Sequence, residues 1–286
     1  MASLIDKIKE LRELTGAGMM DCKKALVENG EDVDKAKDWL REQGITTAAK
    51  KSGRIAAEGL ALAKIEDGYA AIVEVNCETD FVSRGDDFKA LVNTVLDLLL
   101  KHKPANKEAA DAIINPLLVE ATVKIGEKLS FRRFELVKVE DRGATYIHMG
   151  GKIATVVLLD KKNDELAHGL TMHIAANSPS YITTDDITEE DYNHERGIQL
   201  EITKNDPRLA DKPEKMLKNI VDGKIRKYFS DLVLAEQTYL MDDTKKVGQA
   251  LKDLDNKVLV MFRYQVGEGI EKRQEDFAAE VFGQIK

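Results

Sequence analysis

The order of hydrophobic and polar residues divides the chain into segments of different period. In residues 3–43, apolar side chains recur at helical spacing in three short runs, separated by Gly16–Gly18 and by Asn29-Gly30. This pattern predicts a unit of three helices, the last of which ends at Gly44. Residues 45–59 have no clear period, so they are predicted to be a linker.

From residue 60 the period changes to two, which is typical of strands. Residues 60–65 and 69–76 predict a hairpin with a type I′ turn at Asp67-Gly68. A polar segment ends the second strand and is followed by Phe81. An aromatic side chain beside a carboxylate at such a polar tip suggests a wedge that a partner receives. The alternative is that Phe81 folds back into its own core, which is the usual behaviour of an isolated Phe.

Later segments predict further helices and strands. Helices are expected at 86–101, 107–124 (interrupted or restarted at Pro116), 164–176, 187–229 as a pair, and 276–282. Strands are expected at 129–139, 145–149, 152–159, 232–240 and 258–266. The strand-then-helix blocks that begin at Gly68 and Gly151 look like a loose repeat. We therefore expect an α+β fold with a core of two related antiparallel subdomains.

These segments predict five parts along the chain. They are an N-terminal three-helix domain with its linker (1–54), a first core subdomain (55–140), a second core subdomain (141–186 and 230–270), a helical hairpin (187–229) and a C-terminal module (271–286). The hairpin is expected to project from the body, because its apolar stripes are narrow and the rest of its surface is polar.

Composition limits the classes of function. The chain has 286 residues, 43% of them hydrophobic, and a net charge of -8, which disfavours a nucleic acid as the main partner. No apolar run approaches the ~20 residues of a membrane span, and the N-terminal residues lack the layout of a signal peptide. Cys22 and Cys77 are far apart, so neither a disulfide framework nor a cysteine zinc site is expected, and a reducing cytoplasm fits.

The sequence lacks the common motifs of catalysis. The sequence has no phosphate-binding loop, no G-x-S-x-G and no H-E-x-x-H, and its five histidines are scattered. His148, at a strand end before Gly150-Gly151, is the one histidine predicted to contact a partner. Cys77 as a nucleophile is an alternative, but the sequence supplies no base for it. We expect no catalysis by this chain alone, no cofactor and no metal.

Several long motifs resemble those of the translation elongation factor Ts family, in the family's order from end to end. They are Leu11–Leu26 (LRELTGAGMMDCKKAL), Val75–Val82 (VNCETDFV), Lys124–Glu127 (KIGE), Tyr146–His148 (YIH), His173–Ala176 (HIAA), Val266–Lys272 (VGEGIEK) and Asp276–Val281 (DFAAEV). The resemblance implies an exchange factor without catalytic chemistry of its own, which binds the GTPase elongation factor Tu and promotes GDP release. It also implies a ubiquitin-associated type of N-terminal domain.

The resemblance further implies which residues contact the GTPase. Within the Thr79–Val82 motif, Asp80 and Phe81 would act on the partner's Mg²⁺ site, with Phe81 entering a hydrophobic slot. The other implied contacts are Met19 and Met20, Ile125, Gly126 and His148, Leu240 and Met241, and a C-terminal helix with Phe277 and Val281. For the Met pair and the C-terminal helix, burial within the chain's own core is the alternative. In some relatives the hairpin serves self-association, which stays open for this chain.

Three rival hypotheses remain for comparison. The three-helix domain alone could hold ubiquitin-like or peptide ligands, although the intact Asp80-Phe81 tip argues against this. An enzyme using Cys77 would need a low thiol pKa. An RNA-binding protein would need a basic stripe, which the charge counts do not offer.

Overall fold

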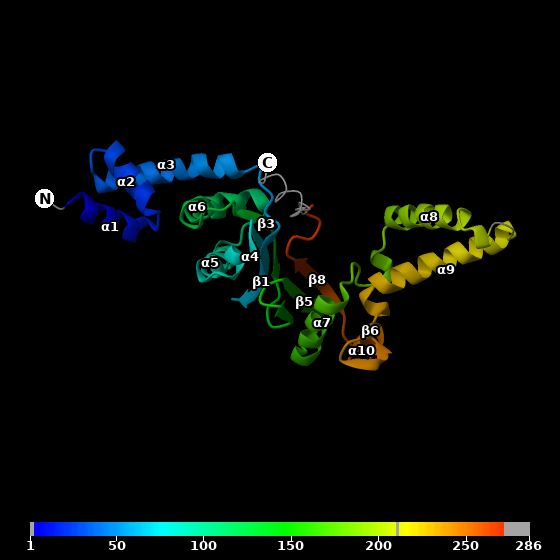
Figure 1. The fold of residues 1–286 in the computed structure, drawn as a ribbon. Coiled ribbons are helices and arrows are strands. Elements are labelled where there is room, and N and C mark those ends of the chain that lie inside the picture. The colour runs from blue at the N-terminus through cyan, green and yellow to red at the C-terminus, as the bar shows by residue number, and fades with distance from the viewer. Residues whose placement is uncertain (1–2, 210–211, 272–286) are drawn as a thin grey trace. The chain divides into compact units, whose positions relative to one another are not determined.

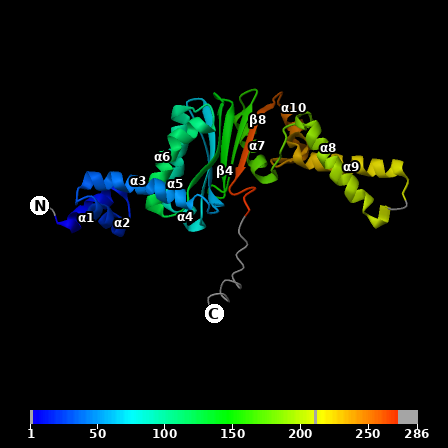
Figure 2. The same cartoon turned by 90° about the horizontal axis from the view of Figure 1, so that it is seen from above.

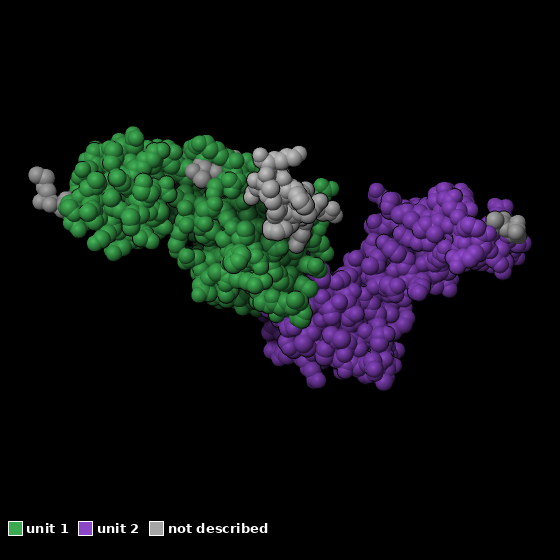
Figure 3. Space-filling view, viewed as in Figure 1, with its two compact units in different colours: residues 1–137, 147–154, 264–286 green, residues 138–146, 155–263 purple. Residues whose placement is uncertain are grey.

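The computed structural model describes residues 3–209 and 212–271, which form two compact units (Figure 3). Unit 1 comprises residues 1–137, 147–154 and 264–286, and unit 2 comprises residues 138–146 and 155–263. Helices and antiparallel strands occur in both, so the predicted α+β class is confirmed. Among the described residues, no helix combines the length and the hydropathy that a membrane span needs. The five-part division stays a prediction.

Three helices open unit 1, as the sequence predicts: α1 (Leu4–Thr15), α2 (Met19–Glu28) and α3 (Val33–Lys51). Ser3 and Asp6 form a capping box at the start of α1, and Gly16 ends the helix in the left-handed conformation. The three helices share a small core of their own, in which Leu11, Cys22 and Leu26 are fully buried.

The third helix continues past Gly44, so the prediction that it ends there is wrong. Residues 45–51 are helical instead of forming a linker. The reason is the contact with α6 (Lys107–Ile125): a Cβ on Gly44 would lie 2.7 Å from Cγ2 of Val123. Glycine therefore allows the two helices to approach closely, and this contact outweighs its low helix propensity of about 1 kcal/mol.

A three-stranded sheet of order β1-β2-β3 forms the centre of unit 1. Strands β1 (Glu58–Glu66) and β2 (Tyr69–Cys77) pair antiparallel, and β3 (Ser130–Lys138) lies beside β2. Asp67 and Gly68 both have positive φ, as a type I′ turn requires. Helices α5 (Asp86–His102) and α6 pack against this sheet through a core that includes Val73, Phe88, Val92, Leu99 and Ile114 (Figure 1). Helix α6 is continuous through Pro116.

The second three-stranded sheet has the order β4-β5-β8. Its strands are β4 (Gly143–His148), β5 (Ile153–Leu159) and β8 (Val258–Gln265). In unit 2, helices α7 (Asp164–Asn177) and α10 (Val247–Asp253) share a core that includes Val157, Leu170, Ile174 and Val247.

The strand predicted over 232–240 is wrong for most of its length. Leu234–Glu236 is a 3₁₀ turn (η3), and only Thr238–Tyr239 forms a strand (β6), paired with β7 (Asp242–Lys246). Val233 and Leu234 are both fully buried, although they are consecutive. A short apolar run of this kind does not distinguish a strand from a buried turn.

The predicted helical pair is present as α8 (Glu189–Lys204) and α9 (Glu214–Leu232), which lie side by side (Figures 1 and 2). The buried side chains of Val221, Ile225 and Phe229 form its core. Short 3₁₀ turns precede and follow α8, at Thr184–Asp186 (η1) and Pro207–Leu209 (η2). The helix predicted at 276–282 lies outside the described residues.

Candidate functional site

The candidate site begins where β2 ends. This strand is buried through Cys77, and the chain then turns into the short helix α4 (Asp80–Arg84). Thr79 caps the helix, because its hydroxyl accepts the backbone N–H of Val82 at 3.4 Å. The sequence therefore places a helix, not a loop, after the strand.

Phe81 is the most exposed large hydrophobic residue among those described, with 87% of its surface accessible. The interpretation in which Phe81 folds back into its own core is wrong. Val82 packs against the core of unit 1, and Ser83 is buried, with its hydroxyl donating to the Asp80 carbonyl at 3.0 Å. Because successive helical residues point about 100° apart, anchoring these two side chains holds Phe81 outward. The Asp80 carboxylate pairs with Arg84 at 2.9 Å.

Glu127 holds the turn before α4 through three hydrogen bonds. Its Oε2 accepts the backbone N–H groups of Glu78 and Thr79, both at 3.0 Å. Its Oε1 accepts the Thr79 hydroxyl at 2.6 Å. A hydrogen bond that an ionised carboxylate accepts is stronger than a hydrogen bond between two neutral groups. The segment that carries Phe81 is thereby fixed from the end of α6.

A reciprocal contact joins the same two segments. The Glu78 carboxylate accepts the Lys128 backbone N–H at 2.6 Å and the Arg54 guanidinium at 3.2 Å. The Lys128 ammonium in turn donates to the Ser52 and Arg54 carbonyls at 2.6 and 2.7 Å. Glu127 belongs to one of the sequence motifs, but the sequence alone predicts no role for it, because Glu78 and Glu127 are 49 positions apart.

Three other predicted contact residues lie near this end of the sheet. Ile125 and Gly126 end α6 directly before Glu127; Ile125 is half-buried against the core, and Gly126 is an exposed left-handed cap. His148 is half-buried at the end of β4, and its carbonyl accepts the Gly151 and Lys152 N–H groups.

The turn after His148 is tied to the first strand of the hairpin. The Lys152 ammonium lies 2.8 Å from the Glu58 carboxylate, and the Gly151 carbonyl accepts the Ala61 N–H at 2.7 Å. Glu58 pairs with Cys77 across the hairpin, one residue before Glu78. The His148 turn and the α4 segment are thus attached to the same end of β1 and β2.

Met19 and Met20 open helix α2 and are exposed, at 58% and 72%. Neither belongs to the buried core of the three-helix unit, so burial there does not account for them. An exposed pair of flexible thioethers is suited to an adaptable contact surface.

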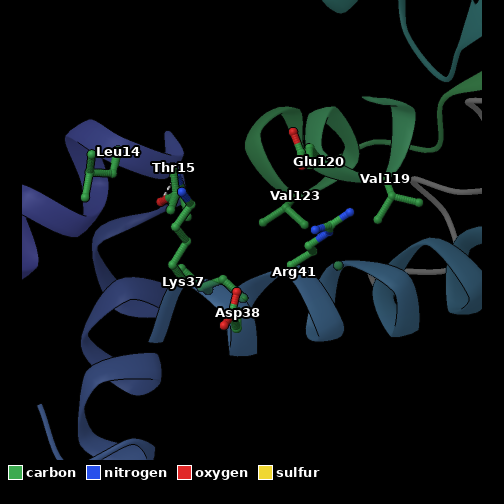
Figure 4. Close-up of a pocket in the computed structure, with 11 residues that line it drawn as sticks. Leu14, Thr15, Lys37, Asp38, Arg41, Val119, Glu120 and Val123 are labelled. Carbon is green, nitrogen blue, oxygen red and sulfur yellow. Dashed lines mark hydrogen bonds between the residues drawn. The ribbon is translucent and has the colours of Figure 1, made fainter. Parts of the chain in front are cut away.

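A pocket of about 320 Å³ lies where the three-helix unit meets α6 (Figure 4). Leu40 and Gly44 of α3 and Val119 and Val123 of α6 line it, together with charged side chains of both helices. This face of α3 thus lies against α6 of the same chain.

Leu240 and Met241, in unit 2, form the turn that joins β6 to β7. Their exposed fractions are 49% and 47%. A cavity of about 640 Å³ borders this turn and is lined mainly by α7, α10 and the β6–β7 turn, including Met172, Tyr239, Met241 and Leu254. The apolar side chains therefore lie at an open surface of unit 2.

Glu74 forms a buried ionic cluster in unit 1, which sequence reasoning missed. Its fully buried carboxylate accepts from Arg132 (2.9 Å), Arg133 (2.6 Å), the Asn76 amide (3.1 Å) and the Gly267 backbone N–H (2.8 Å). Burial raises the pKa of Glu74, but these hydrogen bonds together outweigh burial and hold the pKa below its usual value. The cluster attaches the chain at Gly267 to the centre of the sheet.

The thiol of Cys77 is unsuited to nucleophilic catalysis. Burial, with the nearby Glu127 carboxylate, raises the pKa of Cys77 to about 12. Among the described residues, no group of three or more His, Cys, Asp or Glu side chains is arranged to hold a metal ion.

An α+β fold that holds an aromatic side chain in solvent on a fixed helix defines a protein suited to contact another macromolecule. Comparison with known proteins specifies the family. The family model for Elongation factor TS matches residues 78–268. Elongation factor Ts of Limosilactobacillus reuteri (strain DSM 20016) is 44% identical over 287 residues, which cover 98% of this chain and 97% of that protein. Elongation factor Ts of Limosilactobacillus reuteri subsp. reuteri (strain JCM 1112) gives the same values.

The chain belongs to the elongation factor Ts family, and it is therefore a translation elongation factor of protein biosynthesis. The family resemblance that the motifs predict is confirmed.

Proposed function

We propose that this protein is a guanine-nucleotide exchange factor that binds elongation factor Tu with GDP and promotes GDP release, so that GTP can load. The observation that carries the proposal is Phe81, exposed to 87% on a helix that Thr79, Val82 and Ser83 hold in place. Family membership supports the identity of the partner.

The proposed mechanism uses the free energy of burying this ring. Transfer of a Phe side chain from water into an apolar slot is worth about 1.5–3 kcal/mol. In the proposed complex, Phe81 and Asp80 disturb the segment of the GTPase that holds Mg²⁺ and the phosphates, which weakens GDP binding. Because coupling is reciprocal, nucleotide binding also weakens the exchange factor, so each guanine nucleotide can displace it.

The rigidity of the α4 segment supports this mechanism. A side chain that was ordered only on binding would lose conformational entropy, whereas one already fixed does not. The Glu127 hydrogen bonds to Glu78 and Thr79 supply this order before the partner arrives. The chain would consume nothing and would need no cofactor or metal of its own.

We assign the remaining contacts to separate surfaces. Met19 and Met20 would press on the GTPase from α2, and Ile125, Gly126 and His148 would border the Phe81 contact. Leu240 and Met241 would form a contact in unit 2. The proposed setting is the cytoplasm, where translation takes place. Phe277 and Val281, also proposed as contacts, lie outside the described residues.

Release of a fluorescent GDP analogue from elongation factor Tu tests the proposal. The intact chain should accelerate release, and Phe81→Ala should lose most of this effect. Ile5→Ala is the matched control, since Ile5 is an exposed apolar residue on α1, at 65%, with no assigned contact.

Each result has a defined meaning. Acceleration that survives Phe81→Ala would retain the function and move the mechanism to Asp80 or His148. No acceleration by the intact chain, with Mg²⁺ and a matching partner present, would refute the exchange-factor proposal.

A further inference from the structure

Helix α7 forms a seat for the β6–β7 turn in unit 2. Gly169 and His173 lie four residues apart on α7, and therefore on one face of the helix. Both meet the segment Tyr239–Met241, which bears the two exposed apolar side chains. The two residues act on this segment in different ways.

Gly169 provides the space for the turn. A Cβ at this position would lie 2.3 Å from the Tyr239 hydroxyl and 3.0 Å from Cγ of Met241. Glycine within a helix lowers helix stability, and this close approach explains its presence. Any larger residue would push Tyr239 and Met241 away from α7.

His173 fixes the backbone of the turn. Its ring is fully buried, and Nδ1 accepts the Leu240 backbone N–H at 3.2 Å. Nδ1 therefore carries the lone pair, so Nε2 carries the proton and donates to Oε1 of Gln237 at 2.8 Å. The Gln237 amide then donates to the Asp231 carbonyl at 2.7 Å, at the end of α9. The imidazole thus joins α7, the end of α9 and the turn.

The backbone of the turn is held against α7, while its two apolar side chains stay about half exposed. Leu240 and Met241 remain about half exposed although Tyr239 beside them is buried. Such an arrangement costs little ordering entropy when a partner covers the two side chains.

We propose that Gly169 and His173 are positioning residues that present Leu240 and Met241 to the partner GTPase. This inference rests on the proposed function, because it takes the GTPase as the partner of this surface. It predicts that substitutions of Gly169 or His173 weaken binding only by displacing Leu240 and Met241.

Two readouts test the proposal. The first is amide hydrogen exchange at Leu240 in the full chain alone, which needs no partner. Exchange should be slow in the wild type and at least about tenfold faster in His173→Leu, because the N–H then lacks its acceptor. His173→Asn can place an amide oxygen near the position of Nδ1 and should keep much of the protection. His194→Leu, at an exposed histidine of α8, is the matched control and should change nothing.

The second readout is the affinity for nucleotide-free elongation factor Tu. His173→Leu and Gly169→Ala should each weaken binding by about five- to tenfold. In the background of Leu240→Ala with Met241→Ala, neither substitution should weaken it further. Circular dichroism identifies any variant that fails to fold, and the Asn variant then carries the test.

The outcomes separate this inference from the exchange function. Unchanged Leu240 exchange in folded His173→Leu would overturn the positioning role, whatever the protein binds. The positioning role would also be overturned if His173→Leu or Gly169→Ala weakened binding just as much when Leu240 and Met241 were already alanine. If the wild type accelerates GDP release but Leu240→Ala with Met241→Ala binds normally, the exchange function stands and this inference fails. If the wild type neither binds nor accelerates release, the proposed function itself has failed.

Discussion

Phe81 remains in water because contacts of the neighbouring residues fix the orientation of α4. Val82 and Ser83 face the core, and Thr79 is fixed by the Glu127 carboxylate, so no rotation of α4 can bury the ring without breaking these contacts. Leaving a Phe exposed forfeits about 1.5–3 kcal/mol of burial. The same free energy is available when a partner covers it.

Glu127 should therefore matter for exchange although it is not expected to touch the partner. Glu127→Ala removes three hydrogen bonds and should loosen the α4 segment by about 1–2 kcal/mol. We expect slower GDP release at limiting protein, measured by nucleotide fluorescence. Glu120→Ala, at an exposed carboxylate on α6, the helix that ends just before Glu127, should behave like the wild type. Equal rates for both variants would remove Glu127 from the mechanism.

His173 should give the protein a distinct response to acid. Burial lowers the pKa of His173 below its usual 6.5, and the bond to Gln237 offsets this only partly. The unfolded chain then takes up a proton at higher pH than the folded chain does, so stability is unaffected at pH 7–8 and falls as the pH drops below 6.5. Tyr239, the titratable side chain facing the ring, has a pKa raised by burial and stays neutral throughout.

Urea unfolding at pH 7.5 and 5.5 measures this effect. The loss of stability in acid should be smaller in His173→Asn than in the wild type, because the substituted side chain does not titrate. His194→Asn should keep the wild-type difference. Identical pH dependence in the wild type and His173→Asn would contradict the prediction.

At the scale of elements, the sequence predicts those helices, strands and turns that are determined by the pattern of neighbouring residues. The hairpin, its turn at Asp67-Gly68 and the helix after residue 85 follow from period and turn chemistry alone. The end of α3 and the 3₁₀ turn at Leu234 do not, because they depend on contacts with Val123 and with the core of unit 2. The way in which the turn before Phe81 is held is likewise set by a distant residue, Glu127.

Gly44 provides a direct test of the α3–α6 contact. Gly44→Ala adds a methyl group 2.7 Å from Cγ2 of Val123, which forces the Val123 side chain or one of the helices to shift. The gain in helix propensity, about 1 kcal/mol, is opposed by overpacking of about 1–3 kcal/mol. We expect net destabilisation in thermal unfolding. Gly44→Ala combined with Val123→Ala should recover stability, and failure to recover would place the strain elsewhere.

At the scale of the whole molecule, the chain leaves unit 1 and returns to it. Unit 1 consists of three separate stretches of sequence, and the last begins at Tyr264. The Glu74 carboxylate accepts a hydrogen bond from the Gly267 N–H in this last stretch. Gly267 has a φ of 74°, and a Cβ at this position would lie only 2.3 Å from the Ala57 carbonyl oxygen. Only glycine fits this site.

Glu74 should protect unit 1 against unfolding except in strong acid. Its pKa is lower in the folded chain than the usual 4.5, so its contribution is complete above that pH and is lost as the pH falls through the folded value. Glu74→Gln should cost about 1–3 kcal/mol at pH 7, because the half-buried guanidinium groups of Arg132 and Arg133 lose their charge partner. Urea unfolding checks both statements, and a loss below about 1 kcal/mol would contradict the second.

The bond between Glu74 and Gly267 also has a consequence for synthesis. The two residues are 193 positions apart, so at about 5–20 residues per second the ribosome needs roughly 10–40 s to make the donor after the acceptor. Once β3 has also been made, the nascent sheet has the carboxylate and both arginines but not the glycine that completes the cluster. Unit 1 therefore reaches its final form only after Gly267 has emerged, and a message truncated before codon 264 would yield a protein in which the Glu74 cluster is unfinished.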